Sequence, residues 1–216
     1  MDDCWAKSRD PSSGVIQPDP EAFPDGMKAV ADYVHGKGLL FGVYTDRGEQ
    51  TCVGRPGSQG YEAIDAKTYA SWGVDYVKED SCNATSDHNA SFAQYGKMRD
   101  ALNATGRPIY FDLCGWSSWY APVGKTLGNA WRVGYDVNNW GGVMNNALSV
   151  DKNLAQYAGP GGWNDIDALI GTNKDTAVHL TELQSRTQFN LWSLLSAQLI
   201  IGAANASSFG GEPRVA

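Results

Sequence analysis

The stretch Val74-Asp75-Tyr76-Val77-Lys78-Glu79-Asp80-Ser81-Cys82 decides the fold class and the candidate chemistry of this 216-residue chain. It begins as a β-branched and aromatic run, which is typical of a buried strand. It ends in three consecutive charged residues and a cysteine, although buried charges must be paired or hydrogen-bonded. We therefore predict a strand whose C-terminal end opens into an active-site cleft, with Asp80 as the catalytic nucleophile.

Similar apolar runs alternate with helix-like segments along the chain. Strands are predicted at 39–45, 74–80, 108–114, 130–133, 162–169 (strand and turn) and 199–202. Helices are predicted at 27–34, 63–72, 91–105, 143–157 and 181–199, the last being the longest. The residues between Trp5 and Gly26 are predicted to form a polar, proline-containing loop. This alternation indicates a βα repeat and a parallel sheet.

Two arrangements of a parallel sheet compete. A doubly wound sheet normally carries a glycine-rich phosphate turn, and the chain has neither a GxGxxG nor a Walker sequence. A (β/α)₈ barrel instead places functional groups at the C-terminal ends of many strands. Such groups follow the apolar runs here: Asp2, Asp3, Asp46, Lys78, Asp80, Cys114, Trp116, Arg132, Asp136 and Asp167. We therefore predict an α/β protein, a (β/α)₈ TIM barrel truncated by its first strand and helix.

Composition and cysteine spacing exclude several partners. The formal net charge is −7 and no basic run is present, so nucleic acid is not an expected partner. No apolar run approaches the length of roughly 18 residues that a membrane span needs. The four cysteines form no CxxC pair, and neither a metal nor another cofactor is expected. Cys52 and Cys82 both lie just past predicted strands, which suggests a disulfide between neighbouring loops.

Strand-end carboxylates combined with tryptophans indicate glycoside hydrolysis. The chain has eight Trp, several beside polar residues, and a sugar site needs apolar ring faces next to hydrogen-bonding groups. The reaction needs one carboxylate to attack the anomeric carbon and a second, protonated carboxyl to assist the leaving oxygen. Asp80 and Asp136 are the best candidates, because each lies near a cation, Lys78 or Arg132. These residues alone do not decide which is the acid, and structural salt bridges are the alternative.

Six short motifs follow one another along the chain: Asp2-Asp3-Cys4-Trp5, Phe41-Gly42-Val43-Tyr44-Thr45-Asp46, Tyr76-Val77-Lys78-Glu79-Asp80-Ser81-Cys82, Leu113-Cys114-Gly115-Trp116, Trp131-Arg132-Val133-Gly134-Tyr135-Asp136 and Gly162-Trp163-Asn164-Asp165-Ile166-Asp167. In order and spacing, the series resembles that of glycoside hydrolase family 27, whose best-known members are α-galactosidases. The resemblance implies a retaining enzyme with a (β/α)₈ catalytic barrel followed by a β-sandwich domain. By the same resemblance, residues 1–216 are a partial barrel without that C-terminal domain.

The resemblance also implies roles for individual residues. Asp80 corresponds to the nucleophile, Asp136 to the acid/base, and Cys52–Cys82 to a family disulfide. Cys4 corresponds to a cysteine whose usual partner lies upstream. The substrate-binding residues implied are Asp2, Asp3, Trp5, Lys78, Cys114, Trp116, Arg132 and Asp167, with Trp5 and Trp116 as aromatic walls. For Asp46 and Asp167, a supporting role is at least as well founded as direct catalysis.

Several positions depart from the family pattern. Glu79 stands where an aromatic residue is usual, and Ala168 replaces a usual Met. Gly115 and Ser118 are smaller than in many α-galactosidases and resemble the α-N-acetylgalactosaminidase branch. The pair Asp2-Asp3 favours a sugar with a 6-hydroxyl over the β-L-arabinopyranosidase specificity.

Together these features predict a secreted or extracytoplasmic retaining α-galactosidase whose partner is a carbohydrate with a terminal α-D-galactosyl residue. An α-N-acetylgalactosaminidase and a non-catalytic sugar-binding barrel fragment are the alternatives. The chain itself shows no signal peptide, which we expect to have been lost with the N-terminus.

Overall fold

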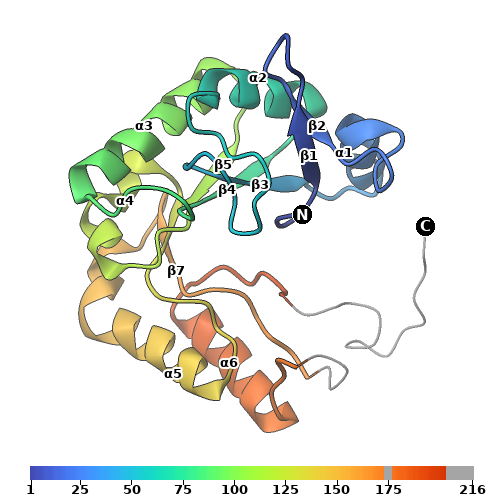
Figure 1. Ribbon diagram of the computed structural model, residues 1–216. Helices are drawn as coiled ribbons and strands as arrows, with labels where there is room; N and C mark the ends of the chain where they lie inside the picture. The colour runs from blue at the N-terminus through green and yellow to red at the C-terminus, as the bar shows by residue number, and fades with distance from the viewer. Residues whose placement is uncertain (173–176, 203–216) are drawn as a thin grey trace. The chain divides into compact units, whose positions relative to one another are not determined.

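The computed structural model describes residues 1–172 and 177–202, whose helices and strands are labelled in Figure 1. The chain divides into two compact units. Unit 1 comprises Met1–Cys114 and Thr126–Asn129, and unit 2 the remainder of the described chain. Each unit contains parallel strands followed by helices, and each is described by itself.

Unit 1 is built around three parallel strands, β3 (Gly42–Asp46), β4 (Tyr76–Asp80) and β5 (Tyr110–Leu113). The helices of this unit are α1 (Gly26–Gly36), α2 (Glu62–Trp72) and α3 (His88–Ala104), so that a helix follows both β3 and β4. In the register between these two strands, Tyr44 lies opposite Lys78 and Asp46 opposite Asp80. Both strands therefore end at the same edge of the sheet, with a carboxylate on each, as the sequence predicts for a functional site.

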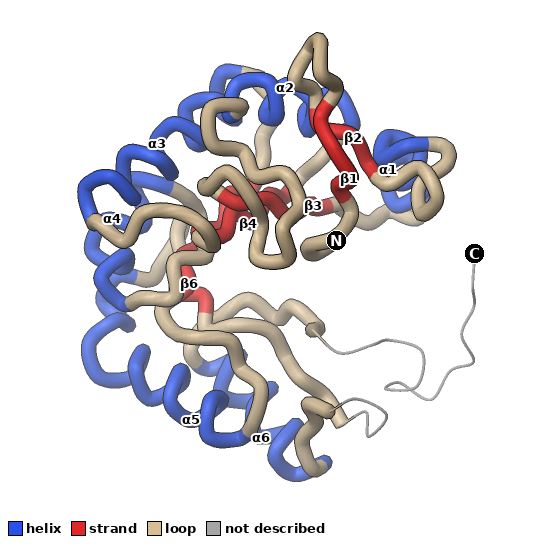
Figure 2. Tube along the Cα trace, viewed as in Figure 1, coloured by secondary structure: helices blue, strands red, loops and turns tan. Residues whose placement is uncertain are grey.

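The segment after Trp5 forms an antiparallel hairpin of β1 (Ala6–Arg9) and β2 (Ile16–Pro18), shown in red in Figure 2. The prediction of a polar loop is wrong here. Ile16 is buried, and the guanidinium of Arg9 binds both carboxylate oxygens of Asp65 on α2, each at 2.6 Å. A contact between residues so far apart in sequence fixes the hairpin and leaves no trace in local periodicity.

Unit 2 contains the parallel strands β6 (Ala130–Arg132) and β7 (Trp163–Asp165). Its helices include α5 (Trp140–Ser149) and α6 (Glu182–Leu194), and the chain continues from α5 through a π-helical turn, Val150–Leu154, and a 3₁₀ turn, Ala155–Tyr157. A 3₁₀ turn, Ser118–Tyr120, leads into α4 (Ala121–Leu127), whose last two residues belong to unit 1. Neither of these last two elements is predicted from the sequence.

The helix predicted at 181–199 is correct in its start and wrong in its length. Thr181 and Gln184 form a reciprocal capping box that begins α6. The helix ends at Leu194, and Ser196 adopts a φ of 54° that does not continue it. With 13 residues it is shorter than α3, which has 17. The predicted strand at 199–202 is reduced to a parallel bridge between Leu169 and Ile201.

Within the described ranges, no helix has both the length and the apolar character that crossing a membrane requires.

Candidate active site

Asp80, the last residue of β4, is the centre of the predicted site. The residue is 5% exposed. Its carboxylate accepts a hydrogen bond from the Tyr44 hydroxyl at 2.8 Å through Oδ2 and one from the Ser81 N–H at 2.8 Å through Oδ1. Burial raises the pKa of Asp80, while the Lys78 ammonium and these donors oppose that rise. A cation and directed donors favour the ionised form of a buried carboxylate, which is the form that nucleophilic attack needs.

Tyr44 is not among the site residues predicted from the sequence. It lies on β3 opposite Lys78, and the Lys78 ammonium lies 5.3 Å from the centre of its ring. Burial and the neighbouring Asp80 raise the pKa of Tyr44, so its hydroxyl stays protonated and acts as a donor. Strand alternation could have found it, because Tyr44 shares a side of the sheet with Asp46 and, through the register, with Asp80.

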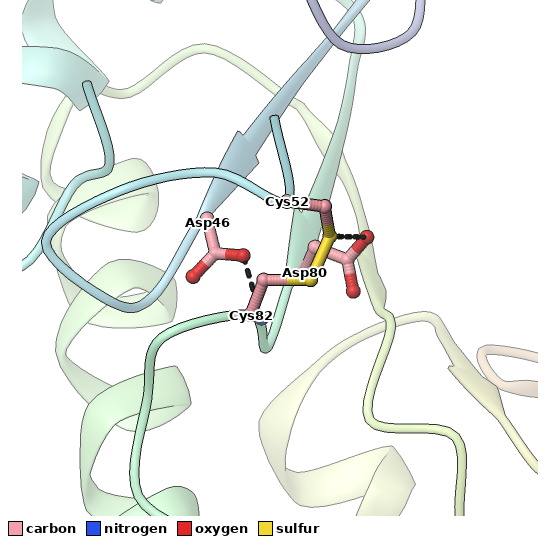
Figure 3. A group of neighbouring side chains, drawn as sticks. All are labelled: Asp46, Cys52, Asp80 and Cys82. Atoms are coloured by element: carbon pink, nitrogen blue, oxygen red, sulfur yellow. Dashed lines mark hydrogen bonds between the residues drawn. A yellow bond between two sulfur atoms is a disulfide. The ribbon is translucent and has the colours of Figure 1, made fainter. Parts of the chain in front are cut away.

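The predicted disulfide between Cys52 and Cys82 is confirmed and lies against Asp80 (Figure 3). The Sγ atom of Cys52 is 3.5 Å from Oδ2 of Asp80 and 3.3 Å from the Tyr44 hydroxyl. The disulfide joins the loops that follow β3 and β4, and it thereby forms part of the surroundings of the candidate nucleophile.

Asp46, the last residue of β3, supports these loops. Its Oδ1 accepts the N–H of Gly48 and its Oδ2 the N–H of Cys82, both at 2.7 Å. The side chain is fully buried. Burial raises the pKa of Asp46 to about 7. The hydrogen bond from the Gly48 N–H opposes this rise, and repulsion from Asp80 adds to it. These contacts describe a positioning role, which agrees with the supporting role considered from the sequence.

The side chains of Asp46, Cys52, Asp80 and Cys82 place their ligand-type atoms within 4.8 Å of one another. A metal would need thiolates from the cysteines, and both sulfurs are joined in the disulfide. The donor set therefore does not suit a metal ion.

The two N-terminal carboxylates, Asp2 and Asp3, have different surroundings. The Nζ atom of Lys78 is 3.4 Å from Oδ2 of Asp2, whose side chain is 71% exposed. Oδ1 of Asp3 accepts the N–H of Cys4, while Oδ2 is buried and has no hydrogen-bond partner among the described residues. Buried acceptors of this kind are normally satisfied, so a ligand hydroxyl would complete the site.

Two other predicted binding residues of unit 1 are fully enclosed. Trp5 is 3% exposed, donates its indole N–H to the carbonyl of Tyr44 at 2.8 Å, and packs edge-on against Tyr69 and Trp72. Trp5 is thus enclosed by other aromatic side chains, and its role as an aromatic wall of the pocket stays a prediction. Cys114 is fully buried as a free thiol and hydrogen-bonds Asp80.

Glu79 points to the other side of β4 from Lys78 and Asp80. It is fully buried, and neither of its carboxylate oxygens has a hydrogen-bond partner in the part of the chain that the structure describes. Burial, reinforced by Asp46 and Glu62, raises the pKa of Glu79 well above its usual range. These surroundings favour the neutral, protonated form of Glu79.

Unit 2 brings together the remaining predicted groups around Arg132. This guanidinium is buried and contacts Oδ1 of Asp136 at 2.8 Å and Oδ2 of Asp167 at 2.9 Å. The Asp136 side chain is 75% exposed, whereas Asp167 is largely buried. Burial raises the pKa of Asp167, and Arg132 opposes that rise. Trp116 is half-buried and adopts a φ of 51°, which is rare for a large residue.

Asp2, Asp3, Lys78, Asp80 and Cys114 thus belong to unit 1, and Trp116, Arg132, Asp136 and Asp167 to unit 2. The individual roles assigned to them remain predictions.

Comparison with known proteins shows the family of this chain. Residues 1–207 match the family model described as alpha galactosidase A. The chain belongs to this family, glycoside hydrolase family 27. It is 45% identical over 206 residues to a protein named probable alpha-galactosidase from Dictyostelium discoideum, covering 94% of this chain and 51% of that protein.

Solved structures of family 27 resemble the chain closely. The α-galactosidase of Saccharomyces cerevisiae matches with a TM-score of 0.85 at 36% identity, over 94% of this chain and 49% of the yeast chain. The yeast enzyme solved with raffinose matches with a TM-score of 0.83 at 34% identity, over 96% of this chain and 51% of the yeast chain. The predicted (β/α)₈ barrel class is confirmed by these neighbours. The chain spans about half the length of the relatives it matches.

Proposed function

We propose that the protein carrying this chain is a retaining α-galactosidase that releases terminal α-D-galactosyl residues by double displacement. The observation that carries the proposal is the Asp80 carboxylate, buried at a strand end and held by Tyr44, Ser81 and the charge of Lys78. Membership of family 27 and the resemblance of the motifs to those of α-galactosidases support the same assignment.

In the first step, an Asp80 oxygen attacks the anomeric carbon and the bond from that carbon to the leaving oxygen breaks. Asp136 gives its proton to that oxygen, and a galactosyl ester of Asp80 results. In the second step Asp136, now ionised, takes a proton from water, whose oxygen attacks the anomeric carbon and frees Asp80. Two inversions give net retention.

The exposure and contacts of Asp136 suit this double role. An acid/base group must reach both the leaving group and the incoming water, and the side chain is 75% exposed. Its contact with Arg132 orients the carboxylate.

The remaining charged groups are proposed to bind the sugar. The hydroxyls of galactose are both donors and acceptors, so a site for them needs carboxylates and cations together. Asp2, Asp3 and Lys78 supply these in unit 1, and Arg132 and Asp167 in unit 2. The unpartnered Oδ2 of Asp3 is a suitable acceptor for a sugar hydroxyl.

One structural observation supports galactose rather than N-acetylgalactosamine as the sugar in the proposed substrate. Gly115 resembles the branch that accommodates an acetamido group, but the space beside it is already filled. A Cβ added at Gly115 would overlap the ring of Tyr120, which is 1% exposed. The small residue therefore accommodates Tyr120 rather than opening free volume for a larger sugar.

Galacto-oligosaccharides are the proposed substrates, since the yeast relative was solved with raffinose. An extracytoplasmic location is proposed on the Cys52–Cys82 bond, because such bonds persist mainly in oxidising compartments.

The test uses the complete protein with nitrophenyl α-D-galactoside and the matching N-acetylgalactosaminide. We expect faster hydrolysis of the galactoside, α-galactose as the first product seen by NMR, and loss of activity in Asp80→Asn. An active Asp80→Asn variant would sink the assignment, and β-galactose as first product would exclude the retaining mechanism. A faster rate on the N-acetylgalactosaminide would favour the alternative specificity, and sugar binding without turnover would favour a non-catalytic barrel.

A further inference from the structure

Asn146 on α5 is a buried polar residue in unit 2 that none of the predicted roles uses. It is 6% exposed and shares a helix face with Val143 and Ala147, which are buried as well. Placing an amide among apolar neighbours costs free energy unless its hydrogen bonds are made. The contacts of Asn146 therefore indicate why a polar residue occupies this position.

The side-chain nitrogen of Asn146 bonds two segments that are distant in sequence. It donates to the carbonyl of Tyr135 at 2.9 Å and to the carbonyl of Ile166 at 3.3 Å. These residues directly precede Asp136 and Asp167, the two carboxylates that Arg132 contacts. One amide thus fixes the backbone immediately before each carboxylate of the cluster.

Gly134 shows that the amide is closely fitted. A Cβ added at Gly134 would overlap the side-chain oxygen of Asn146. The loop and the amide can therefore occupy their places only if residue 134 has no side chain.

We propose that Asn146 is a positioning residue that sets the place of the acid/base Asp136 and of Asp167 by binding the carbonyls of Tyr135 and Ile166. This inference rests on the proposed function of Asp136. The Asp136 side chain is largely exposed, so few side chains pack against it. The position of its carboxylate therefore depends on its own backbone and on Arg132.

The leaving group distinguishes positioning from stability. A dinitrophenyl leaving group departs without a proton, whereas a methyl leaving group needs one from the acid. A misplaced Asp136 should therefore slow hydrolysis of methyl α-D-galactoside far more than formation of the galactosyl enzyme from dinitrophenyl α-D-galactoside. Loss of folded protein would lower the rate with the methyl substrate and the burst amplitude with the dinitrophenyl substrate by the same factor.

The experiment compares Asn146→Ala with Asn145→Ala, the exposed asparagine beside it on α5, in the complete protein. We expect Asn146→Ala to slow the methyl substrate by about 10- to 100-fold, because a general acid contributes about 10²- to 10⁴-fold and is only displaced here. The pre-steady-state burst with the dinitrophenyl substrate should keep its rate constant and its amplitude, and Asn145→Ala should match the wild type. Gly134→Ala should reproduce the Asn146→Ala pattern, and it serves as the test if Asn146→Ala does not fold.

Asp136→Ala separates the inference from the function on which it rests. The positioning role is overturned if Asp136→Ala shows the leaving-group dependence but Asn146→Ala and Gly134→Ala lower the methyl rate no more than the burst amplitude or the burst rate constant, or leave all three unchanged. If Asp136→Ala itself shows no such dependence, the acid/base assignment fails, and the inference fails with it.

Discussion

The hydroxyl of Tyr44 donates to Oδ2 of Asp80 over 2.8 Å, and the disulfide sulfur of Cys52 lies beside both groups. The candidate nucleophile is thereby surrounded by a protonated donor, a neutral sulfur and, from its own strand, the Lys78 ammonium. In the proposed mechanism these neighbours decide at which pH Asp80 is ionised and which of its oxygens is free to attack.

Tyr44→Phe should raise the pKa of Asp80, because the lost hydrogen bond favours the ionised form. Hydrogen bonds to charged groups contribute about 1.5–3 kcal/mol, which corresponds to roughly one to two pKa units. The acidic limb of the kcat/KM profile should move to higher pH by that amount, and kcat/KM measured across that limb should fall accordingly.

Tyr110→Phe is the matched control. It removes a tyrosine hydroxyl from the same sheet, where the hydroxyl bonds the carbonyl of Asn129 at 3.1 Å. Its pH profile should coincide with that of the wild type. An unchanged acidic limb in Tyr44→Phe would contradict the role assigned to this hydrogen bond.

Glu79→Gln should flatten the dependence of stability on pH. The folded pKa of Glu79 lies above the unfolded value, so its contribution is fully present below the unfolded pKa and is lost as pH rises toward the folded pKa. Urea unfolding of the wild type should give a smaller free energy of unfolding at pH 8 than at pH 5. The difference in the free energy of unfolding between pH 5 and pH 8 should shrink in Glu79→Gln, because an amide side chain does not titrate in this range.

Exposed Glu21 offers the comparison: Glu21→Gln should leave the difference between pH 5 and pH 8 unchanged. A Glu79→Gln variant with the full wild-type difference would show that Glu79 does not titrate abnormally. Asp46, with a pKa of about 7, acts in the same direction, so some pH dependence should remain in Glu79→Gln.

The Cys52–Cys82 bond should matter for stability and for activity. A disulfide that spans 30 residues typically stabilises a protein by about 2–4 kcal/mol. The double variant Cys52→Ser/Cys82→Ser should lose that amount in urea unfolding. It should also show a lower kcat, because the loops that hold Asp46 and flank Asp80 are no longer joined.

A trialkylphosphine should have the same effect on the wild type and no further effect on the double variant. Equal rates for reduced and oxidised wild type would mean that the disulfide does not maintain the site.

The motif residues and the local elements were predictable because their signals are local. Asp80 follows an apolar run, and Thr181 precedes an amphipathic segment, so strand β4 and the start of α6 could be inferred. Strand alternation also contained the signal for Tyr44, which lies two residues before Asp46. The β1–β2 hairpin could not be inferred, because the partner of Arg9 is 56 positions away.

The role proposed for Asn146 could not be predicted from the sequence either. Its partners are backbone carbonyls, which every residue has, and nothing in the side chains at 135 and 166 marks them. The burial of Trp5 likewise follows from Tyr69 and Trp72 on α2, which only the fold brings to it.

Breaking the Arg9–Asp65 ion pair should destabilise unit 1 strongly. The Asp65 side chain is fully enclosed and that of Arg9 is 12% exposed. Removing one partner of a buried pair leaves an uncompensated charge and costs about 3–5 kcal/mol, whereas replacing both with apolar residues costs far less. Arg9→Met should therefore lower the free energy of unfolding by about 3–5 kcal/mol, and Arg9→Met/Asp65→Leu should recover most of the loss in urea unfolding. The exposed pair Lys28–Asp32 provides the contrast, since Lys28→Met should cost less than about 1 kcal/mol. A double variant that is no more stable than Arg9→Met would mean that the hydrogen bonds from Arg9 to the carbonyls of Gly14 and Gly57, rather than the ion pair with Asp65, fix the hairpin in unit 1.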